Sequence, residues 1–197
     1  MPAGSRGFEF GSGCSTHALR RALAAVSTIE HSAEWLERTE NFDNSAAQLA
    51  CLNPASLTKP SRKKRASDET AVVALSRCWY RLRPIESFDL ENQVAVLAYL
   101  QQSRLVLIDS PPNPAKREHA LFLALRYTPA GAVIILDDLE IRATKRFAQR
   151  FAQQNRNLFR FWILDIDHRL GVFMKLRPGR IHSRPSLIEF VGAWLRA

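Results

Sequence analysis

The chain has few cysteines, and their spacing excludes two kinds of site. Its 197 residues include only Cys14, Cys51 and Cys78, and no C-x-x-C pair is present. A disulfide framework needs an even set of cysteines, and a structural zinc site needs close pairs, so we expect neither. The hydrophobic content of 46% is enough for a buried core without such braces. We therefore expect a single domain over residues 1–197, in a reducing, cytoplasmic compartment.

Long apolar runs are absent as well. No stretch of the sequence approaches the roughly 20 apolar residues that a membrane-spanning helix requires. Residues 1–6 lack the apolar centre of a secretion signal. These two absences predict a protein without a membrane partner.

Acidic residues are outnumbered by basic ones. The sequence has 28 Lys and Arg against 19 Asp and Glu, and its net charge of +9 favours an anionic partner such as nucleic acid or an acidic glycan. Five of the cations fall within residues 59–65, in a segment without helical or strand periodicity. We expect residues 53–68 to form a flexible basic insertion.

A glycine-containing turn is the most informative motif. An apolar segment at residues 7–10 runs into Gly11 and Gly13, and residues 16–25 can form a helix. Glycines allow a tight turn, and the amides at a helix N-terminus face a ligand. Glu30 ends the next β-prone segment, where a carboxylate at a strand tip can accept hydrogen bonds from ribose hydroxyls. The spacing predicts a site for a nucleotide-type cofactor.

The residues around this turn favour one class of cofactor. Thr16 stands where a dinucleotide-binding turn would have its third glycine, and Glu9 precedes the first glycine by two residues. A carboxylate at this place would repel a pyrophosphate but attract an ammonium group. The pattern therefore favours S-adenosylmethionine over NAD. We expect Ser12, Ser15 and Thr16 to line the turn and cap the helix.

Four segments resemble one protein family. E-F-G-S-G-C-S-T at residues 9–16 and S-T-I-E-H-S-A-E-W at residues 27–35 are similar to the first two motifs of class I S-adenosylmethionine-dependent methyltransferases. L-V-L-I-D-S-P-P-N at residues 105–113 and G-A-V-I-I-L-D-D at residues 131–138 resemble the fourth and fifth strand motifs. The resemblance implies an α/β fold, a Rossmann-like, doubly wound, mostly parallel sheet of seven strands with an antiparallel last strand. It also implies that the cofactor is held by Glu9, Gly11, Gly13 and Glu30.

Acidic residues follow two of the predicted central strands. Residues 105–108 end at Asp109, and residues 132–136 end at Asp137 and Asp138. Ligands of open α/β sheets bind outside the carboxyl ends of the strands, so we expect these side chains beside the cofactor. We assign catalytic roles to Asp109 and Asp137, and a further cofactor contact to Asp109.

The same three carboxylates suggest a metal. Asp109, Asp137 and Asp138 stand where cation-dependent O-methyltransferases, which the motifs resemble, hold a divalent ion. Three hard oxygen ligands suit a divalent cation such as Mg²⁺. The alternative is a carboxylate cluster that orients the substrate. Arg117 and Asp138 are the predicted substrate-binding residues, since a cation there could hold an acidic group.

Three functions fit these patterns. The first is S-adenosylmethionine-dependent methyl transfer to oxygen of a small molecule or sugar. The second is nucleic-acid methylation, because Ser110-Pro111-Pro112 resembles the loop of enzymes that methylate flipped bases, although Asn113 replaces the stacking aromatic residue. The third is a non-catalytic methyltransferase-like binding module or truncated relic, because only residues 1–6 precede the first strand to cover the cofactor.

Several further elements are expected. Residues 71–75 and 79–82 are candidates for the third strand, and residues 90–102 for a helix. An apolar stripe within residues 186–195 predicts a helix that packs on its own sheet or forms a homodimer interface. His31 and His119 are expected at the surface, with a role as proton acceptor for either one that faces the pocket. Three aromatic residues are expected in the core: Trp35, Phe161 and Trp162.

Overall fold

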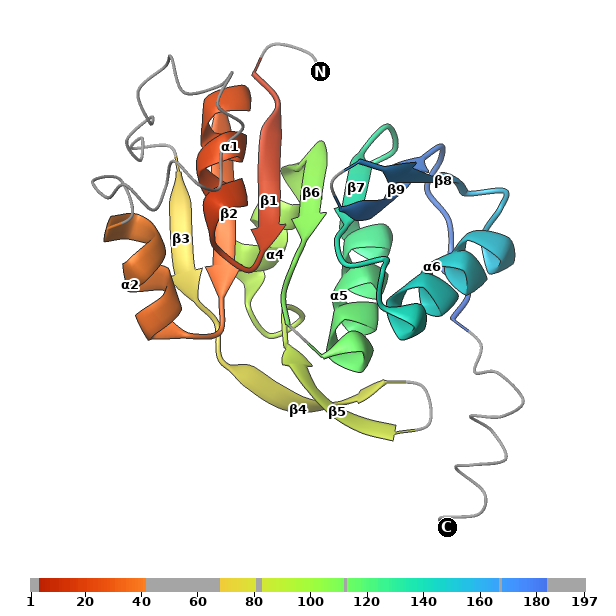
Figure 1. Cartoon of the computed structure of the whole chain (residues 1–197), viewed down its shortest axis with the longest axis horizontal. Coiled ribbons are helices and arrows are strands. Elements are labelled where there is room, and N and C mark those ends of the chain that lie inside the picture. Colours follow the sequence, from red (N-terminus) through yellow and green to blue (C-terminus); the bar gives the residue numbers. More distant parts are fainter. Residues whose placement is uncertain (1–3, 42–67, 81–82, 112, 167, 184–197) are drawn as a thin grey trace.

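The fold is that of an open α/β sheet covered by helices on both faces. The computed structural model describes residues 4–41, 68–80, 83–111, 113–166 and 168–183 (Figure 1). The elements are β1 (Arg6–Phe10), α1 (Cys14–Ala22), β2 (Ala25–Glu30), α2 (Ala33–Asn41), β3 (Glu69–Val72), β4 (Leu75–Tyr80), β5 (Arg83–Phe88), α4 (Val94–Gln102), β6 (Leu105–Ile108), α5 (Pro114–Tyr127), β7 (Val133–Leu136), α6 (Arg142–Gln154), β8 (Phe159–Asp165) and β9 (Arg169–Lys175).

The main sheet has seven strands in the order β3-β2-β1-β6-β7-β9-β8. The first five strands in this order are parallel to one another, and β9 runs antiparallel to both β7 and β8. The predicted fold class is therefore confirmed, including the antiparallel last strand. The strand order reverses between β1 and β6, and ligands of such sheets bind at this point.

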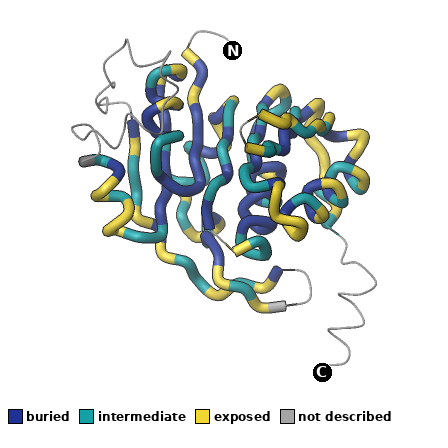
Figure 2. The backbone as a smooth tube through the Cα atoms, viewed as in Figure 1, coloured by how far each residue is buried: buried dark blue, intermediate teal, exposed yellow. Residues whose placement is uncertain are grey.

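Apolar side chains are buried on both faces of the sheet. A large cluster joins Phe8, Phe10 and Ile134 to residues of α4, α5 and α6, such as Leu121 and Phe151. A smaller cluster joins β2 and β6 to α1 on the opposite face. Figure 2 shows the resulting buried centre, with exposure concentrated on the outer sides of the helices. Strand β6 packs against apolar side chains on both of its faces, which explains why its sequence is a continuous apolar run.

An antiparallel hairpin separates β3 from α4. Strands β4 and β5 pair with each other, with Leu75 opposite Phe88 and Cys78 opposite Ile85, and form a sheet of their own. The hairpin lies at the carboxyl end of the parallel strands and packs against α5 (Figure 1). The third strand is β3, at residues 69–72, so assigning residues 79–82 to it was wrong. Both segments are β-prone, and propensity does not distinguish a hairpin from a parallel strand.

The exposure of two tryptophans differs from the prediction. Trp35 is 47% exposed and Trp162 is 38% exposed, so neither is a core residue. Phe161 is partly buried against the large cluster, as expected. Residues 53–67 of the predicted basic insertion and residues 186–195 of the predicted C-terminal helix lie outside the described residues. Within the described part of the chain, no helix is long and apolar enough to cross a membrane.

A buried lysine anchors the end of α5 to β9. Lys175 is 3% exposed, and its Nζ donates to the carbonyl oxygens of Leu125 at 2.8 Å, Arg126 at 3.2 Å and Thr128 at 2.6 Å. The last carbonyl groups of a helix have no partner within the helix, so these contacts satisfy them. Burial lowers the pKa of Lys175, which is consistent with its desolvated position.

Replacing this lysine tests the anchor. We expect Lys175→Met to lower the free energy of unfolding by about 2 kcal/mol, because buried carbonyl groups would lose their donor. The measurement is urea denaturation. Lys116→Met is the control, because Lys116 pairs with the exposed Glu86 and its loss is expected to cost less than about 1 kcal/mol. Equal effects of the two variants would contradict the anchoring role.

Candidate functional site

The predicted cofactor residues lie at the carboxyl edge of the sheet. Strand β1 pairs with β2 on one side and β6 on the other, so that Phe10 stands opposite both Ile29 and Ile108. The glycine turn after β1 therefore lies between Glu30, the last residue of β2, and Asp109, the first residue after β6. This edge forms the candidate site.

Gly11 and Gly13 differ in what their backbones require. Gly11 has φ +99°, and a Cβ atom there would lie 2.6 Å from Cβ of Ser110. Its missing side chain lets the loop after β6 approach β1. Gly13 has φ 167°, an extended conformation that any residue adopts, and a Cβ atom there would meet nothing within 4 Å. Gly13 therefore borders open space at the N-terminus of α1.

Glu9 is a buried carboxylate surrounded by hydroxyl groups. It is 0% exposed, and it accepts hydrogen bonds from Ser15 Oγ and Thr16 Oγ1, both at 2.6 Å, and from Thr28 Oγ1 at 3.1 Å. Burial raises the pKa of Glu9 to about 7, although the three hydroxyl bonds act in the opposite direction. Glu9 therefore has no exposed atom for a ligand and can act on one only through these hydroxyl groups.

Thr16 joins the turn to the helix. Its hydroxyl oxygen accepts a hydrogen bond from the backbone N–H of Gly13 at 2.9 Å while donating to Glu9. The backbone N–H of Thr16 in turn donates to the carbonyl of Gly13. The arrangement is like a capping box in which the carbonyl oxygen of Gly13 takes the place of the N-cap side chain that glycine lacks. It fixes where α1 begins relative to β1.

Glu30 contacts the glycine turn directly. Its Oε2 accepts hydrogen bonds from the backbone N–H of Ser12 at 3.0 Å and from Ser12 Oγ at 3.3 Å. Its Oε1 accepts from the backbone N–H groups of His31 at 2.7 Å and Ser32 at 3.0 Å. The side chain of Glu30 is only 3% exposed. The acid at the tip of β2 and the turn after β1 therefore border the same space.

Helix α2 holds the turn from the other side. Trp35 Nε1 donates to the carbonyl oxygen of Ser12 at 2.5 Å, and Thr39 Oγ1 donates to Ser12 Oγ at 3.2 Å. The exposed indole of Trp35 thus lies beside the turn. Sequence reasoning missed this residue because a tryptophan in an amphipathic segment is usually a core residue. Its place at the end of the S-T-I-E-H-S-A-E-W segment was a signal that could have found it.

His31 connects β2 with the loop after β6. Its Nδ1 lies 2.7 Å from Glu30 Oε1 and 3.3 Å from Ser110 Oγ, and its side chain is 32% exposed. His31 is therefore half-buried at the site, and not a freely solvated surface residue. His119 is 8% exposed and lies away from this edge, so its predicted surface position was wrong.

Arg117 lies between the carboxylates that follow β6 and β7. Its side chain is 3% exposed. Its Nη1 donates to Asp138 Oδ2, and its Nη2 donates to the carbonyl oxygen of Asp109 and lies 3.6 Å from Asp109 Oδ1. Asp137 Oδ1 accepts a hydrogen bond from the backbone N–H of Asp138 at 2.7 Å. Arg117 is thus engaged within the chain and presents little surface to a substrate.

These contacts do not fit the predicted metal site. Among the described residues, no group of three or more His, Cys, Asp or Glu side chains could hold a metal ion. The guanidinium of Arg117 pairs with two of the three proposed ligands, Asp109 and Asp138, and supplies the positive charge that a cation would bring. Asp109 remains 45% exposed, and burial together with the charge of Asp137 raises its pKa.

Solved structures share this fold. A proposed rRNA methylase of Clostridium thermocellum is 12% identical, with a TM-score of 0.57 over 91% of this chain and 90% of that chain. A proposed methyltransferase of Streptococcus mutans, solved in complex with S-adenosylhomocysteine, is 11% identical, with a TM-score of 0.55 over 89% of this chain and 91% of that one. A proposed caffeoyl-CoA O-methyltransferase of Staphylococcus aureus is 12% identical, with a TM-score of 0.50 over 87% and 76%.

No protein-family model and no curated protein matches the chain. The likeness to the solved structures therefore concerns the fold, which is the Rossmann-like fold of class I methyltransferases.

The pKa of Glu9 predicts a pH-dependent stability. Its pKa is raised from 4.5 to about 7, so the folded chain keeps a proton that the unfolded chain releases. This stabilising contribution is complete below about pH 4.5 and is lost as the pH rises through 7. Between pH 5 and pH 8 we expect the free energy of unfolding of the wild type to fall by on the order of 2 kcal/mol relative to that of Glu9→Gln. Urea denaturation at each pH gives both values. A constant difference between the two proteins across this range would contradict the assignment.

Replacement by alanine is expected to change stability at Gly11 but not at Gly13. Gly11→Ala is expected to lower the free energy of unfolding by about 2 kcal/mol, because alanine strains a positive φ and its Cβ meets Ser110. Gly13→Ala is expected to change it by less than about 0.5 kcal/mol, because the backbone is extended and the space is open. Thermal and urea denaturation of the pair provide the measurement. A destabilised Gly13→Ala beside an unaffected Gly11→Ala would refute this geometry.

Proposed function

We propose that the carboxyl edge binds S-adenosylmethionine and that the chain transfers its methyl group to oxygen of a small molecule or sugar. The observation that carries the proposal is the 3.0 Å hydrogen bond between the backbone N–H of Ser12 and Glu30 Oε2. It brings the turn and the strand-tip acid, the two features expected to hold an adenosyl ligand, to one place. The fold shared with the solved methyltransferases supports the same function.

The residues present fit the cofactor. Open space at Gly13 leaves room for a ligand at the N-terminus of α1. Glu30 offers carboxylate oxygens for a ribose diol, which would replace the Ser12 hydroxyl, the longest of its contacts at 3.3 Å. Beneath the turn, an ionised Glu9 polarises the hydroxyl of Ser15 toward an ammonium group. When bound, the cofactor supplies an electrophilic methyl group.

The chain's own part in the reaction is to position the acceptor and remove its proton. Asp109 is the candidate proton acceptor, since it is partly exposed at the edge and its raised pKa makes it a stronger base than an ordinary carboxylate. Asp137 raises that pKa through its negative charge, whereas Arg117 lowers it. Asp138 and Arg117 together fix the loops on which the acceptor would lie. Such alignment accounts for much of the acceleration in group transfer.

Nucleic-acid methylation is the second candidate. The net charge of +9 favours it, and one solved structure of the same fold is a proposed rRNA methylase. The loop resembling a base-flipping signature argues against it, because Asn113 Oδ1 accepts a hydrogen bond from the backbone N–H of Ala115 and caps α5. Retention of an RNA or DNA oligonucleotide at low salt, falling steeply as salt is added, would favour this candidate.

Cofactor binding is tested by calorimetry with S-adenosylhomocysteine. We expect the wild type to bind, and Glu30→Gln to bind at least about tenfold more weakly, because the amide replaces charged acceptors for the ribose hydroxyls. Glu34→Gln on the exposed side of α2 is the matched control and is expected to keep full affinity. No binding by the wild type at saturating ligand would end the proposal. An equal loss of affinity in both variants would show that Glu30 has no specific role in binding.

A further inference from the structure

The positive charge of the chain is concentrated in one segment. Residues 142–183 contain ten Lys and Arg against two Asp, a net charge of +8, whereas the whole chain carries +9. A second basic segment, residues 59–65, has five cations, and the remainder of the sequence has 13 Lys and Arg against 17 Asp and Glu. Within the described part of the chain, the excess of positive charge therefore belongs to α6, β8, β9 and the residues after β9.

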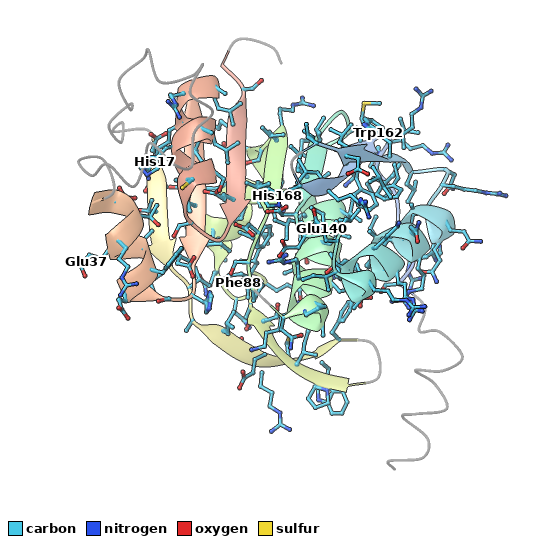
Figure 3. All side chains as sticks on the ribbon, viewed as in Figure 1. His17, Glu37, Phe88, Glu140, Trp162 and His168 are labelled. Carbon is cyan, nitrogen blue, oxygen red and sulfur yellow. The ribbon has the colours of Figure 1, made fainter. Side chains whose placement is uncertain are left out.

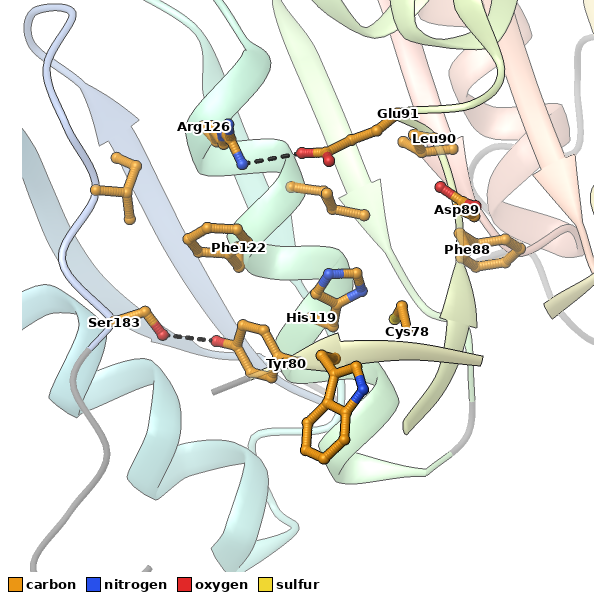
Figure 4. Close-up of a pocket in the computed structure, with 13 residues that line it drawn as sticks. Cys78, Tyr80, Phe88, Asp89, Leu90, Glu91, His119, Phe122, Arg126 and Ser183 are labelled. Atoms are coloured by element: carbon orange, nitrogen blue, oxygen red, sulfur yellow. Dashed lines mark hydrogen bonds and ion pairs between the residues drawn. The ribbon is translucent and has the colours of Figure 1, made fainter. Parts of the chain in front are cut away.

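Several cations of other elements have carboxylate partners. Lys116 of α5 pairs with Glu86 at 3.1 Å. Arg126 pairs with Glu91 at 2.9 Å, beside a cavity between the β4–β5 hairpin and α5 (Figure 4). The charges of these residues are compensated within the chain.

Six arginines of the basic segment are exposed and have no such partner. Arg150 pairs with Glu118 at 3.0 Å, Arg169 pairs with Asp165 at 3.2 Å, and Lys175 is buried. The six exposed arginines, which we call the arginine surface, make no ion pair with any described residue: Arg142, Arg146, Arg156, Arg160, Arg177 and Arg180. Their charges are open to a partner from solution.

The first part of the arginine surface lies along α6. This helix buries Phe147 and Phe151 against the sheet. Its exposed residues recur every three or four positions: Arg142, Arg146, Gln149 and Gln153. That spacing puts them on one side of the helix, and Figure 1 shows α6 at the end of the molecule opposite α2.

The second part surrounds the connection from α6 to β8. Arg177 Nε donates to the carbonyl oxygen of Asn157 at 3.1 Å, and the backbone N–H of His182 donates to Asn155 Oδ1 at 2.7 Å. These contacts bring the chain after β9 to the end of α6. Four arginines of the surface therefore gather there: Arg156, Arg160, Arg177 and Arg180.

The cations at the start of α6 are unfavourable for the helix itself. Its first five residues include Arg142, Lys145 and Arg146 and no acidic residue. Cations near a helix N-terminus oppose the helix dipole, and like charges four residues apart repel each other. Residues that break such local rules without a gain in packing are typical of binding surfaces. An anionic partner would relieve both effects.

An exposed aromatic residue adjoins the arginine surface. Trp162 is 38% exposed and follows Arg160 by two residues in β8, so both side chains lie on the same face of the strand. Figure 3 shows Trp162 at the β8–β9 end of the sheet. An exposed indole can stack on an unpaired base while neighbouring arginines contact phosphates. Neither an acidic glycan nor a lipid headgroup offers a ring for such stacking.

We propose that the arginine surface and Trp162 bind a single-stranded nucleic acid. The six guanidinium groups contact the backbone phosphates, which they can bind through two parallel hydrogen bonds, and the indole of Trp162 stacks on a base. Arg142 lies four residues after Asp138, so the surface begins beside the carboxyl edge of the sheet. The inference goes beyond the methyl transfer proposed above and does not require that function to hold.

Binding is tested on the full chain by fluorescence anisotropy with labelled 15-nucleotide oligouridylate and oligothymidylate. Binding of either probe supports the proposal, and the tighter of the two identifies the nucleic acid. We expect the affinity to fall at least about tenfold between 50 and 200 mM salt, because phosphate contacts release counterions. A duplex of the same length should bind more weakly, because its bases cannot stack on Trp162. No binding at 50 mM salt, or tighter binding of phosphatidylserine vesicles, would overturn the proposal.

A pair of triple variants locates the surface. The first variant carries Arg142→Gln, Arg146→Gln and Arg156→Gln. We expect it to bind the single strand at least about tenfold more weakly at 100 mM salt, with a salt dependence reduced by about two counterions. The matched control loses the same net charge at exposed arginines of other elements and should stay within about threefold of the wild type. Its substitutions are Arg6→Gln, Arg38→Gln and Arg104→Gln. An equal loss in both variants would show that only net charge matters and would refute the surface.

Two further measurements separate binding from folding and from the cofactor. Trp162→Leu should weaken single-strand binding about fivefold and leave duplex binding unchanged, whereas Trp79→Leu, at a tryptophan that is 77% exposed on the hairpin, should change neither. The first triple variant should melt at or above the wild-type temperature, because it removes unfavourable charges from the start of α6. Its affinity for S-adenosylhomocysteine should equal that of the wild type, so failure of the cofactor proposal would appear separately. Equal single-strand affinity of Trp162→Leu and the wild type would refute base stacking.

Discussion

The buried carboxylate of Glu9 is the constraint on which the candidate site depends. It belongs to β1, and its hydrogen bonds reach Ser15 and Thr16 of α1 and Thr28 of β2. One side chain thereby fixes the start of α1 against the two strands that flank the turn. Burying a carboxylate is costly unless hydrogen bonds compensate it, and here three hydroxyl groups offset only part of that cost, so the pKa of Glu9 stays raised. The same desolvation makes the group responsive near neutral pH.

A second group of charged residues lies at the part of the carboxyl edge formed by the loops after β6 and β7. Arg117 reaches from α5 to the loops after β6 and β7 and neutralises carboxylates that would otherwise repel one another. The guanidinium is part of the chain and is always charged, whereas a metal ion has to bind from solution. Arg117 thus places a positive charge beside the acidic residues for which the sequence suggested a metal ion.

Local patterns predicted the fold better than they predicted the site. Residues 105–108 form a continuous apolar run because their strand packs against apolar side chains on both faces, so this strand could be foreseen. The hairpin could not, since β-prone residues do not reveal their partners. Contacts such as Arg117 with Asp138 or Trp35 with Ser12 join residues 21 and 23 positions apart, and only the folded backbone sets their distance. The position of Glu30 beside the turn was predictable because it ends the strand that pairs with β1, and its role toward a cofactor stays a prediction.

Gly11 has a consequence for redesign of this chain. Its φ of +99° and the Ser110 backbone against it leave no room for mutation, so a library aimed at altered specificity has to hold this position constant. Gly13, which lies beside open space, is the neighbouring position that accepts other residues, whereas Trp35 holds the turn through the Ser12 carbonyl and has to be kept. A directed-evolution campaign would therefore randomise the codon of Gly13, which changes the surroundings of the turn without moving the strands beneath it.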